Sequence, residues 1–255
     1  MLTRFALLLA GCFTLQEKIL SKEAQAAQLD ARTDTRVFNG GTMDKFCELA
    51  WTFRDVNICS DLKEIGKIQL TCPFPAAYEP TWREVFETVG RQTQTSWKYS
   101  IKHGGWLFDK PALPPVFTFD LAKGWKQEDR GFYTFCQPPD MPVGMDIYHL
   151  GTYSFEKEAD KELLKIRDAC AVNFAKGIKP DVKLEEMKKT EIDGCEALFL
   201  ETPAPKEKVM WRQWVFAKGG RAIAIVSALD EGKDALLKDV KAMAASFKFV
   251  KEPKK

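Results

Sequence analysis

The sequence is poor in the residues and motifs that build most catalytic and metal sites. Its only two histidines, His103 and His149, are far apart, and no His-x-x-x-His or Cys-x-x-Cys pair occurs. Zinc ligands usually come at such short spacings, so we predict no metal site. The chain also lacks the Gly-x-Gly-x-x-Gly, P-loop and Gly-x-Ser-x-Gly patterns that mark nucleotide sites and serine nucleophiles. We therefore expect no catalytic residue and no cofactor, and predict that the protein is not an enzyme.

An excess of charge of one sign is also missing. The 255 residues carry 38 Lys and Arg against 36 Asp and Glu, a net charge of +2, so nothing global indicates a nucleic-acid partner. Hydrophobic residues make up 45% of the chain, enough for a real core. This length fits either one large domain or two small ones.

The N-terminus carries the clearest local signal. A basic start at Arg4 is followed by an apolar run that is too short to span a bilayer. The run ends in Leu-Ala-Gly-Cys at residues 9–12, which resembles the lipobox of bacterial lipoproteins. In that family the signal peptide is cut before the cysteine, which is then acylated. The resemblance implies a signal peptide at 1–11, lipidation of Cys12, a membrane anchor and a place in the cell envelope, facing the periplasm or the outside.

Two alternatives to the lipobox remain open. The chain could be secreted by cleavage after Ala24-Gln25-Ala26, or it could begin with a cytosolic helix that contains a chance cysteine. Residues 13–36 are polar and contain neither Pro nor Gly. We therefore predict a tether at 12–35, which as a coil would span on the order of 25–30 Å.

A first folded domain is predicted at residues 36–108. Apolar residues at helical spacing around Phe46 indicate a helix, and alternation over 67–72 indicates a strand. Thr81 and Glu84 have the spacing of a capping box at the start of a second helix. A hairpin follows, so the predicted order is βαββα plus a hairpin.

The run from "MDKFCELAWTFRDVNICSDLKEIGKIQLTCPF" to "WKYSIKHGGWLF" resembles the short N-terminal (STN) domain of secretins and TonB-dependent receptors. Such domains are periplasmic, and they contact other proteins rather than catalyse reactions. The chain departs from the secretins in having no pore-forming β region downstream. The resemblance therefore implies a protein partner in the envelope.

Three prolines in residues 109–115 predict a stiff linker. A second domain is predicted at 116–250, with several strands, two helices and a hairpin turn at Asp193-Gly194. The run 222–226 is apolar at every position, which indicates a sheet covered on both faces.

The segments "FTFDLAKGW" and "MAASFKF" of this second domain resemble the PsbP/DcrB-like α/β/α sandwich. This superfamily has a mostly antiparallel sheet with helices, and its members mostly bind or support assemblies. The predicted fold class is thus α+β with two small domains.

Cysteine counts limit the disulfides. If Cys12 is acylated, each domain keeps three cysteines, so each has a free thiol unless a bridge joins the domains. Cys59 and Cys72 are the candidate bridge, since each ends a predicted strand and the two strands are expected to be neighbours. Cys47 and Cys170 have the pattern of small buried hydrophobic residues.

Aromatic residues of the first domain allow two interpretations. Trp97 and Tyr99 share a predicted strand face, and Trp106 and Phe108 lie across the hairpin. We expect a buried cross-strand cluster. The alternative is an exposed platform for a protein partner.

These observations favour a non-catalytic envelope lipoprotein that binds a protein partner, as part of a secretion or transport assembly. The alternative function is a periplasmic carrier, which would hold a small ligand between the domains or along the second sheet.

Overall fold

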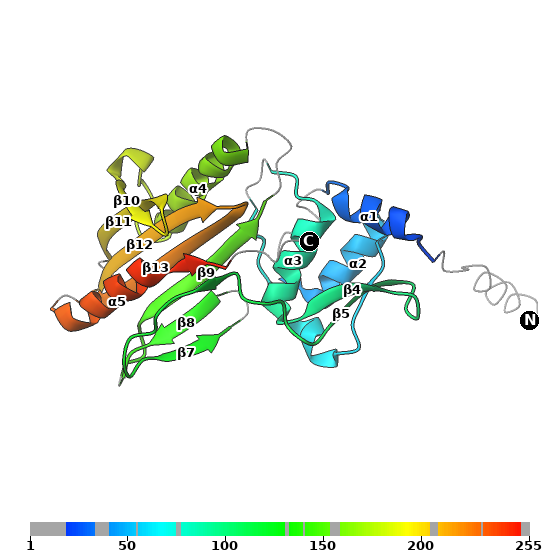
Figure 1. Ribbon diagram of the computed structural model, residues 1–255, viewed down its shortest axis with the longest axis horizontal. Helices are drawn as coiled ribbons and strands as arrows, with labels where there is room; N and C mark the ends of the chain where they lie inside the picture. The colour runs from blue at the N-terminus through cyan, green and yellow to red at the C-terminus, as the bar shows by residue number, and fades with distance from the viewer. Residues whose placement is uncertain are drawn as a thin grey trace, which may run out of the picture.

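The computed structural model has the predicted α+β fold, with two domains side by side (Figure 1). It describes residues 19–33, 41–54, 56–74, 78–130, 133–139, 141–153, 159–204, 209–230 and 232–250.

Helices of the first domain pack against a small mixed sheet. The sheet has the order β2-β5-β4, with β2 parallel and β4 antiparallel to β5, and a separate pair joins β1 to β3. The predicted βαββα-plus-hairpin order is confirmed, although the strand expected at 67–72 shortens to two residues. The elements are α1 (Lys22–Asp30), β1 (Gly41–Thr42), α2 (Met43–Arg54), β2 (Ile58–Cys59), the 3-10 helix η2 (Lys63–Lys67), β3 (Gln69–Leu70), α3 (Trp82–Thr93), β4 (Ser96–Ser100) and β5 (Gly105–Asp109).

The predicted capping box opens α3. Glu84 N–H donates to the Thr81 hydroxyl at 3.3 Å, and Thr81 N–H donates to the Glu84 carboxylate at 2.6 Å. The other Glu84 oxygen accepts from the Tyr78 hydroxyl at 2.7 Å. Both N–H groups at the start of the helix and the buried Glu84 carboxylate thus have hydrogen-bond partners. These hydrogen bonds fix where α3 begins.

Aromatic rings fill the core beneath α3. The Phe86 ring lies 5.4–5.5 Å, centroid to centroid, from the rings of Trp97, Trp106 and Phe108. Trp106 is 3% exposed and Phe108 is fully buried. The predicted core cluster is confirmed, and the exposed-platform alternative is wrong for these two rings.

The prediction of a coil tether over 12–35 is wrong for residues 22–33. These residues form α1 and the turn after it, and Arg32 pairs with Thr81 in a short bridge. Leu29 is buried, and Gln28 accepts a hydrogen bond from the Trp106 indole at 2.7 Å. The segment therefore packs on the first domain and supplies an acceptor for the buried Trp106 indole N–H. Cys12 and the predicted signal peptide 1–11 lie outside the described residues.

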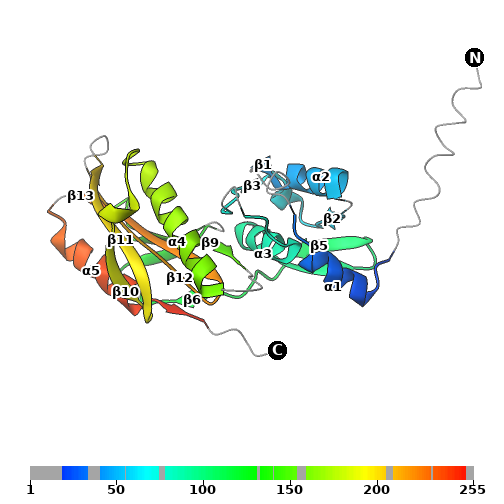
Figure 2. The ribbon, with the colours of Figure 1, turned by 90° about the horizontal axis from the view of Figure 1, so that it is seen from above.

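The second domain is built on one large sheet. Seven strands in the order β10-β11-β12-β13-β9-β8-β7 pair antiparallel throughout. Helix α4 covers one face and α5 the other (Figure 2). The elements are β6 (Phe117–Thr118), β7 (Lys126–Asp129), β8 (Tyr133–Gln137), β9 (Met145–Thr152), α4 (Ala159–Lys176), the 3-10 helix η3 (Leu184–Glu186), β10 (Lys188–Ile192), β11 (Cys195–Ala204), β12 (Val209–Lys218), β13 (Arg221–Asp230), α5 (Asp234–Ser246) and β14 (Lys248–Phe249).

Two predictions for this sheet are confirmed. Asp193 and Gly194 turn the β10–β11 hairpin with positive φ angles of 50° and 69°, as a two-residue turn of this type requires. Strand β13 is buried on both faces over residues 221–227. Helix α5 ends at Ser246, and residues 248–249 then pair with β6.

A continuous apolar core joins the two domains. The ring of Tyr153, 3% exposed at the end of β9, meets Phe74 at 5.8 Å and Tyr78 at 5.1 Å, both edge-on. Its hydroxyl donates to Leu150 O at 2.8 Å. Gly220, at φ 74°, lets the β12–β13 turn approach, since a Cβ there would lie 2.6 Å from Tyr153 O. The second domain thus holds this ring rigidly against the first.

The capping box allows a direct test of fold energetics. Thr81→Ala should lower the free energy of unfolding by about 1 kcal/mol, because it removes the acceptor for Glu84 N–H. Urea denaturation measures the change. Thr81→Ser, which keeps the hydroxyl, is the matched control and should stay close to wild type. Equal losses for both variants would contradict the role assigned to the hydroxyl.

Candidate functional site: a cavity between the domains

A cavity of about 430 Å³ lies where the end of α3, the linker and the sheet of the second domain meet. The linker side is mainly apolar, and the sheet side adds polar groups from β7, β8 and β9. The lining residues that matter below are Arg91, Leu113, Phe117, Thr134, Ile147 and His149.

Hydrogen bonds tie the linker to the end of α3. Arg91 Nη1 donates to Pro114 O at 3.0 Å, while Nη2 pairs with Glu87 at 2.8 Å. Lys110 Nζ donates to Gln94 O at 2.8 Å, and Gln94 Nε2 reaches Asp129 O on β7 at 3.0 Å. Both domains and the linker therefore share one bonded frame around the cavity.

His149 brings a neutral imidazole to the cavity wall. Burial, and then the charges of Arg91 and Arg221, hold the pKa of His149 well below its usual range. One ring nitrogen contacts the Thr152 hydroxyl at 3.4 Å. Because the ring is neutral near pH 7, it can donate at one nitrogen and accept at the other.

The remaining walls of the cavity consist mainly of apolar side chains, with few polar groups among them. Leu113 and Phe117 come from the linker side, and Ile147 and Thr134 come from the sheet. The charge of Arg91 is compensated by Glu87. Such a site suits a small, mainly apolar molecule with one or two hydrogen-bonding groups.

The predicted Cys59–Cys72 bridge is wrong. The two sulfur atoms are not bonded to each other: Cys59 Sγ contacts Trp106 O at 3.6 Å, and Cys72 Sγ contacts Phe74 O at 3.9 Å. The reason is topological, since β2 pairs with β5 whereas β3 pairs with β1 in a different sheet. Cys59 on β2 and Cys72, two residues after β3, therefore do not lie on neighbouring strands.

Cys170 and Cys47 were both predicted to be buried; the first is buried and the second is half-buried. Cys170 is 7% exposed, and burial raises its pKa to about 11. Cys47 is half-buried, and burial raises its pKa to about 12. Thiols with raised pKa values are poor nucleophiles.

The two histidines do not come together. His103 lies in the β4–β5 turn of the first domain, with Nδ1 2.8 Å from the Ser100 hydroxyl and Nε2 3.3 Å from Asp61. Across the described residues, no group of three or more His, Cys, Asp or Glu side chains is arranged to hold a metal ion. Nor does any described helix have the length and apolarity needed to cross a membrane.

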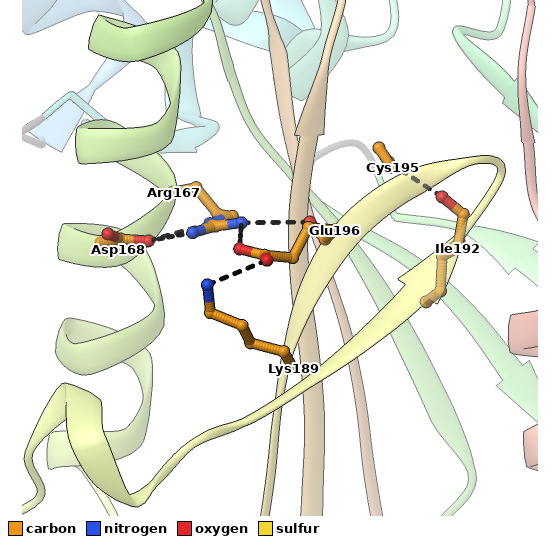
Figure 3. Close-up of polar contacts among 6 residues, drawn as sticks. All are labelled: Arg167, Asp168, Lys189, Ile192, Cys195 and Glu196. Carbon is orange, nitrogen blue, oxygen red and sulfur yellow. Dashed lines mark hydrogen bonds and ion pairs between the residues drawn. The ribbon is translucent and has the colours of Figure 1, made fainter.

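A buried ionic network fixes α4 on its face of the sheet (Figure 3). Arg167, 4% exposed, donates to Asp168 at 2.6 and 2.9 Å and to Glu196 at 2.9 Å. Lys189 adds a second ion pair to Glu196 at 3.0 Å. The two carboxylates that pair with the buried guanidinium, Asp168 and Glu196, are themselves partly exposed to solvent. A buried charge with such hydrogen-bonded partners is tolerated as part of a fold. We assign this network to the fold and not to a site.

The cavity residues gave no signal in the sequence. Arg91 lies in the last turn of α3, Thr134 and His149 lie on different strands, and only the fold brings them together. The one clue was the proline-rich linker, which predicts a fixed connection but not a pocket behind it.

Comparisons of the chain with known proteins show only distant structural similarity. No protein-family model matches the chain, and no curated protein is significantly similar to it. A solved structure from Bacteroides thetaiotaomicron VPI-5482 matches 55% of this chain and 47% of its own, at 17% identity and a TM-score of 0.38. LpqN of Mycobacterium tuberculosis, described as involved in cell envelope biogenesis, matches 53% of this chain and 83% of its own, at 14% identity and a TM-score of 0.30.

This chain thus spans about half the length of the Bacteroides protein. Both TM-scores are low, and nothing about the function of this chain is taken from either protein.

The half-buried imidazole of His149 predicts that the stability of the fold depends on pH. The pKa of His149 is lower in the folded chain than in the unfolded chain, so mildly acidic solution protonates the unfolded chain first. The free energy of unfolding should therefore fall as the pH drops below about 6.5. His149→Gln should reduce this fall, as measured by urea denaturation between neutral and mildly acidic pH. His103→Gln is the matched control for loss of a histidine. An unchanged pH dependence in His149→Gln would contradict the half-buried neutral ring.

Proposed function

We propose that this chain is a non-catalytic binding protein of the bacterial cell envelope that holds a small ligand in the cavity between its domains. The observation that carries the proposal is the cavity itself. Its volume of about 430 Å³ falls within the range of roughly 300–1,000 Å³ that is typical of small-molecule sites. Its walls come from both domains and from the linker between them.

The frame around the cavity supports binding rather than catalysis. Arg91 is already bonded to Glu87 and Pro114, and among the described residues His149 has no carboxylate partner to make it a strong base. A general base usually has such an orienting partner. The cavity therefore offers shape, apolar area and a few hydrogen bonds.

The envelope location rests on the sequence. The Leu-Ala-Gly-Cys pattern at 9–12 supports lipid anchoring through Cys12, and the STN-like and PsbP/DcrB-like patterns fit envelope proteins. A lipid anchor would hold the two domains beside a membrane, where apolar ligands partition.

Binding of a protein partner in a secretion or transport assembly stays a prediction. The surface feature that favours it is Trp51 on α2, a large apolar side chain that is 49% exposed. Tryptophan is prominent among residues that carry binding energy at protein interfaces.

The anchor can be tested by intact-mass analysis of the full chain expressed in bacteria. We expect the loss of residues 1–11 and the addition of a diacylglyceryl or triacyl mass at Cys12. Cys12→Ser is the matched control and should carry no lipid. A wild-type chain that keeps its first residues and gains no lipid mass would contradict the anchoring.

The cavity can be tested separately with the neutral fluorophore N-phenyl-1-naphthylamine, whose emission rises in apolar surroundings. We expect one saturable site per chain. Ala112→Trp should weaken binding by roughly tenfold or more, because the indole would fill the cavity mouth that Ala112 lines. Ala235→Trp, at an exposed position on α5, is the matched control and should bind like wild type.

Two results would contradict the ligand-binding proposal. One is the absence of saturable fluorescence in the wild-type chain. The other is equal binding by wild type and Ala112→Trp, which would place the fluorophore elsewhere.

A further inference from the structure

A second cavity, of about 250 Å³, lies on the sheet face opposite to the interdomain cavity. Successive side chains of a strand point to opposite faces, so Phe135 and Asp146 project away from the face that carries Thr134 and Ile147, whereas Tyr133 lines both cavities. The second cavity is lined by Arg130, Tyr133, Phe135, Pro142, Val143, Gly144, Asp146, Trp211, Val226 and Ala228. Ligand binding here does not depend on the function proposed above.

Asp146 is the unusual residue in this cavity. Its Oδ2 accepts from the Tyr148 hydroxyl at 3.3 Å, but its Oδ1 is buried without a hydrogen-bond partner among the described residues. Nor does any described cation pair with it. Burial raises the pKa of this carboxyl group. A buried acceptor without a donor is costly, so a ligand that supplies the donor gains binding energy there.

Aromatic rings around Asp146 suit a positive charge. The Arg130 guanidinium already lies over two of them, 4.5 Å from the Phe135 centroid and 5.8 Å from the Tyr133 centroid. Ring faces attract cations in this geometry. The third ring, Trp211, donates its indole N–H to Gln213 at 3.1 Å, so that N–H is already engaged.

Arg130 makes no hydrogen bond to Asp146, although its positive charge works to lower the pKa of that carboxyl group. One terminal nitrogen pairs with Glu128 at 2.8 Å, and the other donates to the Tyr133 hydroxyl at 3.1 Å. Glu128 offsets part of the guanidinium charge, so Arg130 acts on Asp146 only through space and gives its Oδ1 no hydrogen-bond donor.

The rim beside Asp146 is rigid. A Cβ on Gly144 would collide with the carbonyl oxygen of Cys136, so the backbone is closely packed there. Asp146 itself lies on β9, between β8 and β13. A carboxylate on a central strand, with rigid surroundings, is positioned in advance for a ligand.

We propose that this cavity binds a small protonated primary amine. The ammonium group donates to Asp146 Oδ1, and the hydrocarbon part of the ligand lies against Tyr133, Phe135 and Trp211. A primary ammonium has three N–H donors and fits the unpartnered oxygen, whereas a quaternary ammonium has none.

The test is a titration of the full chain with n-butylammonium, monitored by ¹H–¹⁵N NMR. We expect saturable shifts of the Gly144, Val226 and Ala228 amides, which line the cavity. Asp146→Asn should weaken binding by roughly tenfold or more, because the charge on the acceptor is lost. The asparagine keeps the shape of the side chain and an acceptor for Tyr148, so the variant should fold.

Controls separate this site from general amine binding. Asp230→Asn, at an exposed position, should bind like wild type. Phe135→Leu should also weaken binding, since it removes the ring face. Neutral n-butanol and tetramethylammonium should give much smaller shifts at the same amides.

Three outcomes would overturn the proposal. The first is the absence of saturable shifts at these amides in the wild-type chain. The second is equal affinity of wild type and Asp146→Asn. The third is tetramethylammonium binding as tightly as n-butylammonium, which would show that the Asp146 hydrogen bond contributes nothing.

Discussion

The edge-on packing of Tyr153 against Phe74 and Tyr78 is the contact on which the rest of the structure depends. It buries the end of β9 against the first domain and merges the two domain cores into one apolar cluster. On the other face of the sheet, the Arg91–Pro114 and Gln94–Asp129 hydrogen bonds hold the linker and β7 to the end of α3. Domains fixed at both faces leave a cavity of constant shape between them.

The two cavities lie on opposite faces of the sheet, because neighbouring side chains of β8 and β9 point to opposite faces. On one face, Thr134 and His149 meet apolar residues of the linker, and burial keeps the histidine neutral. On the opposite face, Asp146 lies among aromatic rings, and its Oδ1 has no hydrogen-bond partner among the described residues. One sheet thus offers an apolar site with neutral hydrogen-bonding groups and a site suited to a cation, and their electrostatics differ because their neighbouring charges differ.

Local sequence patterns predicted much of the fold and little of the candidate site. The capping box at Thr81, the Asp193-Gly194 turn and the apolar strand β13 were readable because neighbouring residues determine them. Strand β7 was missed because its Lys-Gln-Glu-Asp sequence lies fully exposed at a sheet edge. Helix α1 and the Cys59–Cys72 pairing were misjudged because long-range contacts decide them: the Trp106 indole and the sheet order. The convergence of Arg91, Thr134 and His149 likewise depends on domain packing.

The central claim is that the two domains behave as one rigid unit around the interdomain cavity. Equilibrium unfolding in urea, followed by far-UV circular dichroism and tryptophan fluorescence, tests it most directly, since both domains contain tryptophan. The shared core predicts coincident curves with one transition. Two separated transitions would contradict the account, because domains that unfold independently do not hold the walls of a common cavity in place.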